Sequence, residues 1–120
     1  MSAQFRHIML MVKDVAAAVQ FYHEGLGLPI KVQSPGWAEI EANGATIAFH
    51  GAAEAPQTGS SPILSFTVDD VHQAIANLET LGGKLEGRVR EPSFGKVAAV
   101  RSPQGHLVSL LQPVAQPTTV

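Results

Sequence analysis

Residues 7–15, HIMLMVKDV, and residues 63–71, ILSFTVDDV, show the same pattern twice: a short apolar run that leads into an aspartate and a valine. A short apolar run of this kind is typical of a buried strand. After each run the apolar residues recur at helical spacing, so both halves are predicted to begin with a strand and a helix. An internal repeat of this type indicates two similar structural modules.

Residues with helix-capping chemistry mark the boundaries of both predicted helices. Asp14 and Asp70 occupy equivalent N-cap positions, where a carboxylate accepts free amide hydrogens of the first turn, and Gln73 is placed to complete a capping box. The helices are predicted to end at Gly25–Gly27 and Gly82–Gly83, because glycine adopts the left-handed conformation that ends a helix. The faces predicted to pack on the sheets carry Val15, Val19, Tyr22 and Leu26 in the first helix and Val71, Ile75, Leu78 and Leu81 in the second.

Three short strand-like segments follow each helix. They cover residues 30–33, 37–42 and 45–50 in the first half, and residues 84–90, 96–101 and 106–112 in the second. The chain is therefore predicted to have an α+β fold of two βαβββ modules, at about residues 5–50 and 63–112, within a single domain. Residues 51–62 are rich in glycine, proline and small polar side chains and are predicted to link the modules, and residues 113–120 are predicted to form a loose tail.

Asn43-Gly44, between two strand-like runs, is the strongest short hairpin signal in the chain. A two-residue turn fixes the register of the strands on either side. The predicted register pairs Trp37 with His50, Glu39 with Ala48 and Glu41 with Thr46. Because side chains alternate along a strand, these six residues are expected on one face. The opposite face, toward the helix, is predicted to carry Ile40, Ile47 and Phe49.

Composition bounds the function. A chain of 120 residues with 45% apolar and 15% charged residues suits one domain with its own core, and the absence of cysteine excludes disulfides, thiolate metal sites and cysteine nucleophiles. The apolar run at residues 7–12 is too short for a signal peptide or membrane span, so the expected location is cytoplasmic, with no membrane partner. The net charge of −2 argues against nucleic acid as a partner. The second half has a local excess of basic residues: Lys84, Arg88, Arg90, Lys96 and Arg101. This excess is compatible with a small anionic ligand, and solvated strand residues also explain it.

Taken together, these segments resemble the vicinal oxygen chelate superfamily, which includes glyoxalase I, bleomycin resistance proteins and extradiol dioxygenases. The resemblance covers about residues 5–112. It is carried by His7 in HIMLMVKD with Phe21-Tyr22 and Gly25-Leu26-Gly27, by VDDVHQAIANLETLGG, and by SPQGHLVSLLQ near the end. It implies two βαβββ modules whose curved mixed sheets enclose a cleft, in a protein that is usually a homodimer.

In metal-dependent members of that superfamily, side chains from the first and last strands of each module bind the ion. The matching positions here are His7, Ala48, Ile63 and Ser109. Only the histidine is a usual metal ligand, because alanine and isoleucine have no donor atom and a serine hydroxyl is a poor one. The resemblance therefore implies no metal at these positions and no required cofactor, which argues against glyoxalase and extradiol chemistry.

A rearranged site stays open. His7, Glu39 and His50 are expected on three adjacent strands, and two imidazoles with a carboxylate can bind a divalent metal or move a proton. The alternative interpretation is structural: His7 as framework, His50 as a solvated ring packed on Trp37, and Glu39 as a solvent-facing strand residue. The other histidines, His23, His72 and His106, are expected to be solvated on helix or turn surfaces.

Three functions follow from these patterns. The favoured one is metal-independent binding of a small amphipathic or aromatic molecule in the cleft. The others are a metal-dependent lyase, isomerase or dioxygenase that uses the rearranged site, and a non-catalytic interaction module. No catalytic residue is assigned, and whether the protein is an enzyme is left open. The predicted ligand-binding residues are His7, Met9, Trp37, Glu39, Ala48, His50, Ile63 and Ser109.

Overall fold

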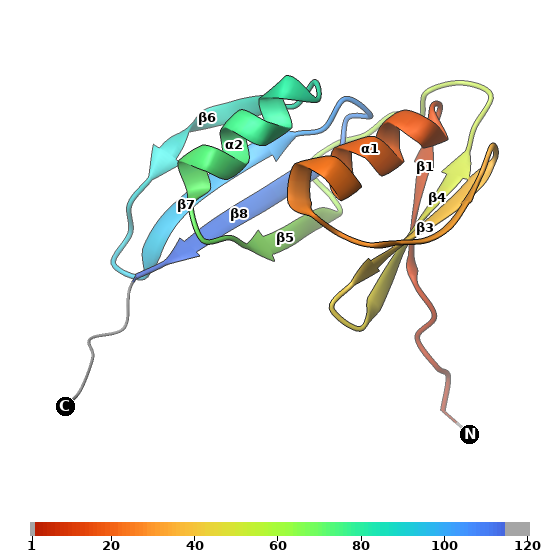
Figure 1. Cartoon of the computed structure of the whole chain (residues 1–120), viewed down its shortest axis with the longest axis horizontal. Coiled ribbons are helices and arrows are strands. Elements are labelled where there is room, and N and C mark those ends of the chain that lie inside the picture. The colour runs from red at the N-terminus through yellow and green to blue at the C-terminus, as the bar shows by residue number, and fades with distance from the viewer. Residues whose placement is uncertain (1, 115–120) are drawn as a thin grey trace. The chain divides into compact units, whose positions relative to one another are not determined.

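The computed structural model describes residues 2–114, and its elements follow the order strand, helix and three strands twice (Figure 1). The first set consists of β1 (Ile8–Val12), α1 (Val15–Leu26), β2 (Ile30–Ser34), β3 (Trp37–Ala42) and β4 (Ala45–Gly51). The second set consists of β5 (Ile63–Thr67), α2 (Val71–Thr80), β6 (Lys84–Arg90), β7 (Gly95–Arg101) and β8 (Leu107–Pro113). This order confirms the predicted α+β fold of two βαβββ modules.

The chain divides into two compact units, residues 1–57 and 58–120, and each unit contains one βαβββ module. Each module has its own four-stranded mixed sheet, and neither sheet is closed. Of the predicted tail, Pro113 ends β8 and residues 115–120 lie outside the described range. Neither helix of the described chain is long and apolar enough to cross a membrane.

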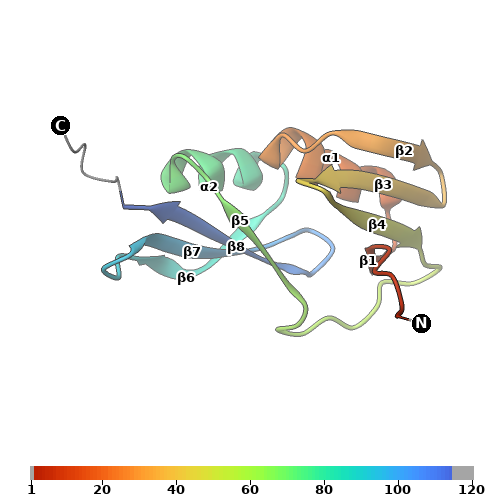
Figure 2. The same cartoon turned by 90° about the horizontal axis from the view of Figure 1, so that it is seen from below.

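In the first sheet the strand order is β1-β4-β3-β2, with β1 parallel to β4 and the other pairs antiparallel (Figure 2). Asn43 and Gly44 form the turn between β3 and β4, with φ angles of 51° and 92°. Left-handed conformations at both turn residues match the twist of the flanking strands. The observed register is the predicted one: Trp37 pairs with His50, Glu39 with Ala48 and Glu41 with Thr46.

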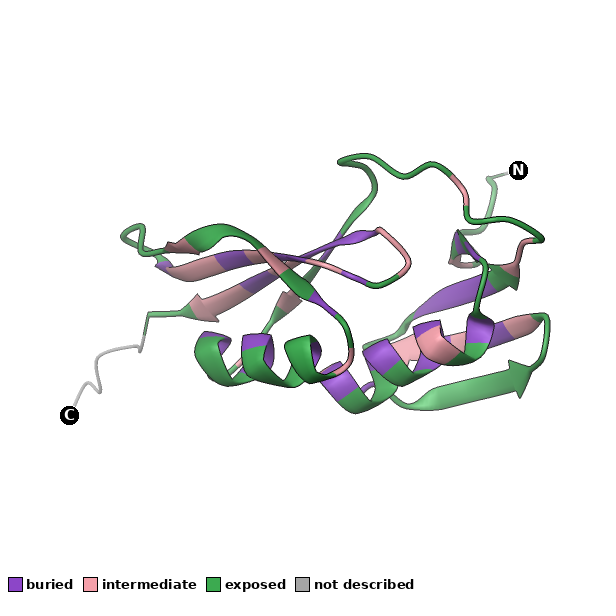
Figure 3. Ribbon diagram, turned by 90° about the horizontal axis from the view of Figure 1, so that it is seen from above, coloured by how far each residue is buried: buried purple, intermediate pink, exposed green. Residues whose placement is uncertain are grey.

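The core of the first module lies between α1 and one face of its sheet. Ile40, Ile47 and Phe49 are buried, as predicted. The Tyr22 ring of α1 packs on the Phe49 ring with centroids 5.3 Å apart, and burial raises the pKa of Tyr22 well above its ordinary value. The edge strand β2, by contrast, is exposed along its whole length (Figure 3).

Both helices begin at the predicted N-caps. Each aspartate accepts an amide hydrogen from the first helical turn, at 3.0 Å for Asp14 and 3.1 Å for Asp70. The predicted capping box does not form, because the Gln73 side chain donates to Asn77 one turn further on. Instead, Gln112 of β8 accepts the N–H of the first residue of α2 at 2.9 Å. The second helix is therefore capped by its own sheet as well as by the aspartate.

The second sheet has the order β5-β8-β7-β6, with β5 parallel to β8. Leu78 of α2 and Val100, Val108 and Leu110 of the sheet are fully buried between the two layers. The edge strand β6 is irregular: Glu86 pairs with Ala99 and Arg90 with Val97, so three residues of β6 lie opposite Ala98 alone. Gly87 within this bulge has φ 74°, a conformation that favours glycine.

Phe49→Ala should lower the free energy of unfolding by about 3–5 kcal/mol, because it removes a fully buried ring and its contact with Tyr22. Urea denaturation followed by circular dichroism measures the change. Val32→Ala is the control, since Val32 is 43% exposed on the edge strand β2 and its truncation should change stability little. Equal effects of the two substitutions would contradict the assignment of the core.

Candidate functional site

The face of the first sheet that points away from α1 carries most of the predicted ligand-binding residues. Along β1, Met9 and Met11 lie on this face, whereas Leu10 and Val12 between and beside them are buried on the other. His7 directly precedes β1 and continues the alternation. The Trp37 face, as we call this surface, consists of His7, Met9, Met11, Val32, Trp37, Glu39, Ala48 and His50.

Trp37 lies at the centre of the polar part of this face and is half-buried. Its ring centroid is 5.6 Å from that of His7 and 6.0 Å from that of His50, and both contacts are edge-to-face. Its Nε1 donates to Glu39 Oε2 at 2.9 Å. The His50 contact was predicted from the register. The His7 contact was not, because His7 lies outside the paired strand and reaches the indole through its side chain.

The apolar part of the Trp37 face surrounds Ala48. This residue pairs with Met9 on one side and Glu39 on the other, and it has no exposed surface. Met9 and Met11, however, are 47% and 38% exposed. Unbranched thioether side chains adapt to irregular surfaces, so this flank offers an adjustable apolar contact.

The rearranged metal site is not assembled in the structure. In the described part of the chain, no three histidine, aspartate or glutamate side chains are close enough to hold a metal ion. Trp37 contacts both imidazoles of the predicted trio, and Glu39 is bonded to the indole. His50 Nδ1 lies 2.8 Å from Gly51 O. His7, Glu39 and His50 therefore support an aromatic ring in place of forming a ligand set.

The other two predicted residues lie on the face of the second sheet that points away from α2. Ile63, at the start of β5, is 51% exposed, and Ser109 in β8 is half-buried. Ile63 pairs with Leu107 and Ser109 with Ser65. The two positions are thus offset by two residues along the strands, about 7 Å.

His106 is buried, and the expectation of a solvated side chain was wrong. The residue is 7% exposed in the turn between β7 and β8, and its backbone N–H donates to Ser102 Oγ at 3.1 Å. Burial, and to a smaller extent the positive charge of Arg101, lowers the pKa of His106. Among residues 2–114, its Nδ1 has no hydrogen-bond partner.

Arg101 explains why this turn is closed, and sequence reasoning missed its role. Its Nη1 donates to Gly105 O at 2.9 Å and to Gly59 O at 2.6 Å, which ties the segment before β5 to the turn. Its Nε and Nη2 both lie 2.8 Å from Glu86 Oε1. The guanidinium is therefore used internally and is not available to a ligand.

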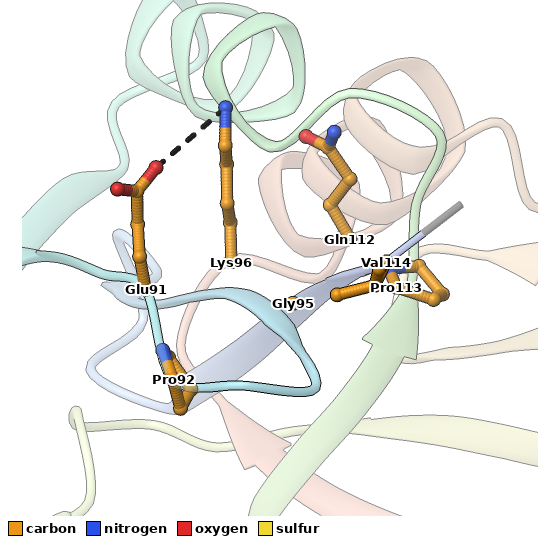
Figure 4. Close-up of a pocket in the computed structure, with 7 residues that line it drawn as sticks. All are labelled: Glu91, Pro92, Gly95, Lys96, Gln112, Pro113 and Val114. Carbon is orange, nitrogen blue, oxygen red and sulfur yellow. Dashed lines mark ion pairs between the residues drawn. The ribbon is translucent and has the colours of Figure 1, made fainter. Parts of the chain in front are cut away.

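Two surface hollows lie in the second module near the connection between β6 and β7. The first, of about 250 Å³, is lined by Glu91, Pro92, Gly95, Lys96, Gln112, Pro113 and Val114 (Figure 4). The second, of about 380 Å³, is lined by His72, Arg88, Val89, Arg90 and Glu91. Neither hollow contains a residue of the predicted ligand-binding set.

Residues 4–110 match the family model of the Glyoxalase/Bleomycin resistance protein/Dioxygenase superfamily. Because this match spans most of the chain, the protein belongs to that superfamily. The membership confirms the resemblance drawn from the strand, helix and turn motifs. Comparison with curated protein sequences yields no match.

Several solved structures share the fold. A glyoxalase-related enzyme from Fulvimarina pelagi is 23% identical, with a TM-score of 0.75 over 92% of this chain and 88% of that one. The fosfomycin resistance protein FosX from Listeria monocytogenes, complexed with Mn(II) and sulfate, is 19% identical, with a TM-score of 0.77 over 95% and 93%. A glyoxalase/bleomycin resistance protein from Albidiferax ferrireducens T118 is 21% identical, with a TM-score of 0.71 over 91% and 98%. Similarity at these identities establishes the fold and not the activity.

The two imidazoles beside Trp37 should limit its contact with water. Trp37 is the single tryptophan, and both imidazole rings lie edge-to-face with its indole, so loss of either ring exposes more of the indole. His7→Ala and His50→Ala should each shift the emission maximum to longer wavelength, and the double variant should shift it further.

The control is His72→Ala, in the second module, which should leave the emission maximum unchanged. An unchanged maximum in the double variant would show that neither imidazole contacts the indole.

Stability should decrease on acidification because of His106. Its pKa is below the ordinary value of 6.5 in the folded chain, so the unfolded chain takes up the proton first as the pH falls. The free energy of unfolding should therefore decline below pH 6.5 and level off below the folded pKa. Urea denaturation between pH 8 and 5 measures this. His106→Gln should flatten the decline, and His72→Gln should not. An unchanged decline in His106→Gln would refute the assignment.

Proposed function

We propose that the Trp37 face binds a small amphipathic or aromatic molecule and that binding does not depend on a metal ion. The observation that carries this proposal is the half-buried indole of Trp37, supported by His7, His50 and Glu39. A ring that is already held in place loses little conformational freedom when a second aromatic group packs on it. Preorganisation of this kind favours binding.

The surroundings of the indole suit a ligand with both apolar and polar parts. Met9, Met11 and Val32 are exposed apolar side chains on the same face. Glu39 and His50 supply hydrogen-bonding groups beside them. Small-molecule sites commonly combine apolar lining with a few polar groups that orient the ligand.

Metal independence is supported by the residues at the superfamily's ligand positions. Ala48 and Ile63 have no donor atom, and the Ser109 hydroxyl is a weak donor. The alternatives are a metal-dependent lyase, isomerase or dioxygenase, and a non-catalytic interaction module. The similar FosX structure is complexed with Mn(II), which is the observation that favours a metal-dependent alternative.

We also propose that the protein acts as a cytoplasmic homodimer. Each sheet has two edge strands, β1 and β2 in the first and β5 and β6 in the second, and a second chain can pair with such an edge.

A neutral amphipathic aromatic probe, 2-naphthol, should change Trp37 emission saturably. The titration should be unaltered after dialysis against EDTA, and protein purified without a metal-binding tag should hold far less than one equivalent of nickel, zinc, iron or manganese per chain. Met9→Ala should weaken the binding of 2-naphthol, because it removes exposed apolar surface beside Ala48. Elemental analysis and fluorescence measure these outcomes.

Phe94→Ala is the matched control, because Phe94 is 60% exposed but lies in the second module. Stoichiometric metal that resists dialysis would overturn metal independence, and release of that metal by Glu39→Ala or His50→Ala would favour the rearranged site. Absence of saturation would favour the interaction module.

A further inference from the structure

We infer that the second module binds a small molecule bearing a phosphate or similar dianionic group, in the hollow of about 380 Å³ beside β6. Five residues line this hollow: His72, Arg88, Val89, Arg90 and Glu91. Two of them carry permanent positive charge, and a third becomes positive on protonation. The two arginines come from the edge strand and the histidine from the first turn of α2, so groups from two elements converge.

Both arginines lie at the bulge in β6, beside this hollow. A regular antiparallel strand would place one residue opposite Ala98, whereas β6 places three there, with Gly87 at φ 74°. Bulges at sheet edges redirect side chains and interrupt pairing. Arg88 lies within the extra segment and Arg90 at its end, and both are exposed.

Neither guanidinium is used internally. In the described residues the side chains of Arg88 and Arg90 make no hydrogen bond or ion pair, whereas the Arg101 guanidinium bonds to Glu86 and to two backbone carbonyls. Glu91, the one carboxylate that lines the hollow, pairs instead with Lys96 at 3.8 Å (Figure 4). The charge of the two arginines is therefore left for an external anion.

The chemistry of these groups favours a compact dianion. Guanidinium groups bind phosphate through two parallel N–H bonds, and two of them can hold one phosphate from different sides. The first amide of α2 is bonded to Gln112 and the Gln73 amide to Asp70, so the two arginine side chains are the main donors that the hollow offers. The net charge of −2 disfavours a long polyanion, and the hollow's volume suits a small molecule.

Titration of the ¹⁵N-labelled full chain with inorganic phosphate, at constant ionic strength, tests the site. Amide shifts of His72 and of residues 88–91 should change saturably. Arg88→Gln/Arg90→Gln should weaken binding by at least about tenfold, because charge-assisted hydrogen bonds are lost. The matched control is Lys84→Gln, an exposed cation of the same strand outside the hollow, which should change affinity by less than about twofold.

Three outcomes would overturn the inference: no saturation with phosphate, equal weakening by Lys84→Gln, or preferred binding of a single-stranded oligonucleotide that all these variants weaken alike. Circular dichroism of the double variant distinguishes loss of the site from loss of the fold. Because no residue of the hollow belongs to the Trp37 face, 2-naphthol binding should persist in that variant, and the two proposals can fail separately.

Discussion

The two-residue turn at Asn43 and Gly44 is the constraint on which the first module depends. Both residues take left-handed conformations, and such a turn allows only one register between β3 and β4. Because side chains alternate along a strand, a slip by one residue would move Phe49 out of the core and Trp37 into it. The same constraint therefore sets the packing of α1 on the sheet and the composition of the exposed face. Stability and candidate function are linked here through backbone geometry.

Features that depend on neighbouring residues in the sequence were predictable. The turn, the N-cap aspartates and the alternation of Ile40 with Trp37 and Glu39 all follow from short-range chemistry. Features that depend on distant pairs were not: the Gln112 cap of α2 joins residues 41 positions apart, and the Arg101 bond to Gly59 O, which ties the segment before β5 to the His106 turn, spans 42. The β6 bulge is also invisible in one sequence, since it is defined by the count of residues on the opposite strand.

Correct strand adjacency was not enough to predict the chemistry of the Trp37 face. His7, Glu39 and His50 are on or beside three neighbouring strands, as expected, and a metal site needs their donor atoms to converge. The indole of Trp37 contacts both imidazoles and takes the carboxylate as its acceptor. The register gives the positions of the Cβ atoms on the face. Which side chains contact one another there depends on the volume of the largest one, the indole of Trp37. Sequence reasoning placed the residues on the face and left their contacts open.

Ala48, which the resemblance matches to a metal-ligand position, adjoins the aromatic site. Its methyl group is fully buried between Met9 and Glu39, so a longer ligand side chain at this position would have to displace its neighbours. A carboxylate buried there without a metal or another partner would be strongly unfavourable. A small apolar residue at position 48 is thus compatible with the Trp37 arrangement, and a longer side chain would require Met9 or Glu39 to move. The small residue at position 48 and the supported indole are therefore parts of one packing arrangement.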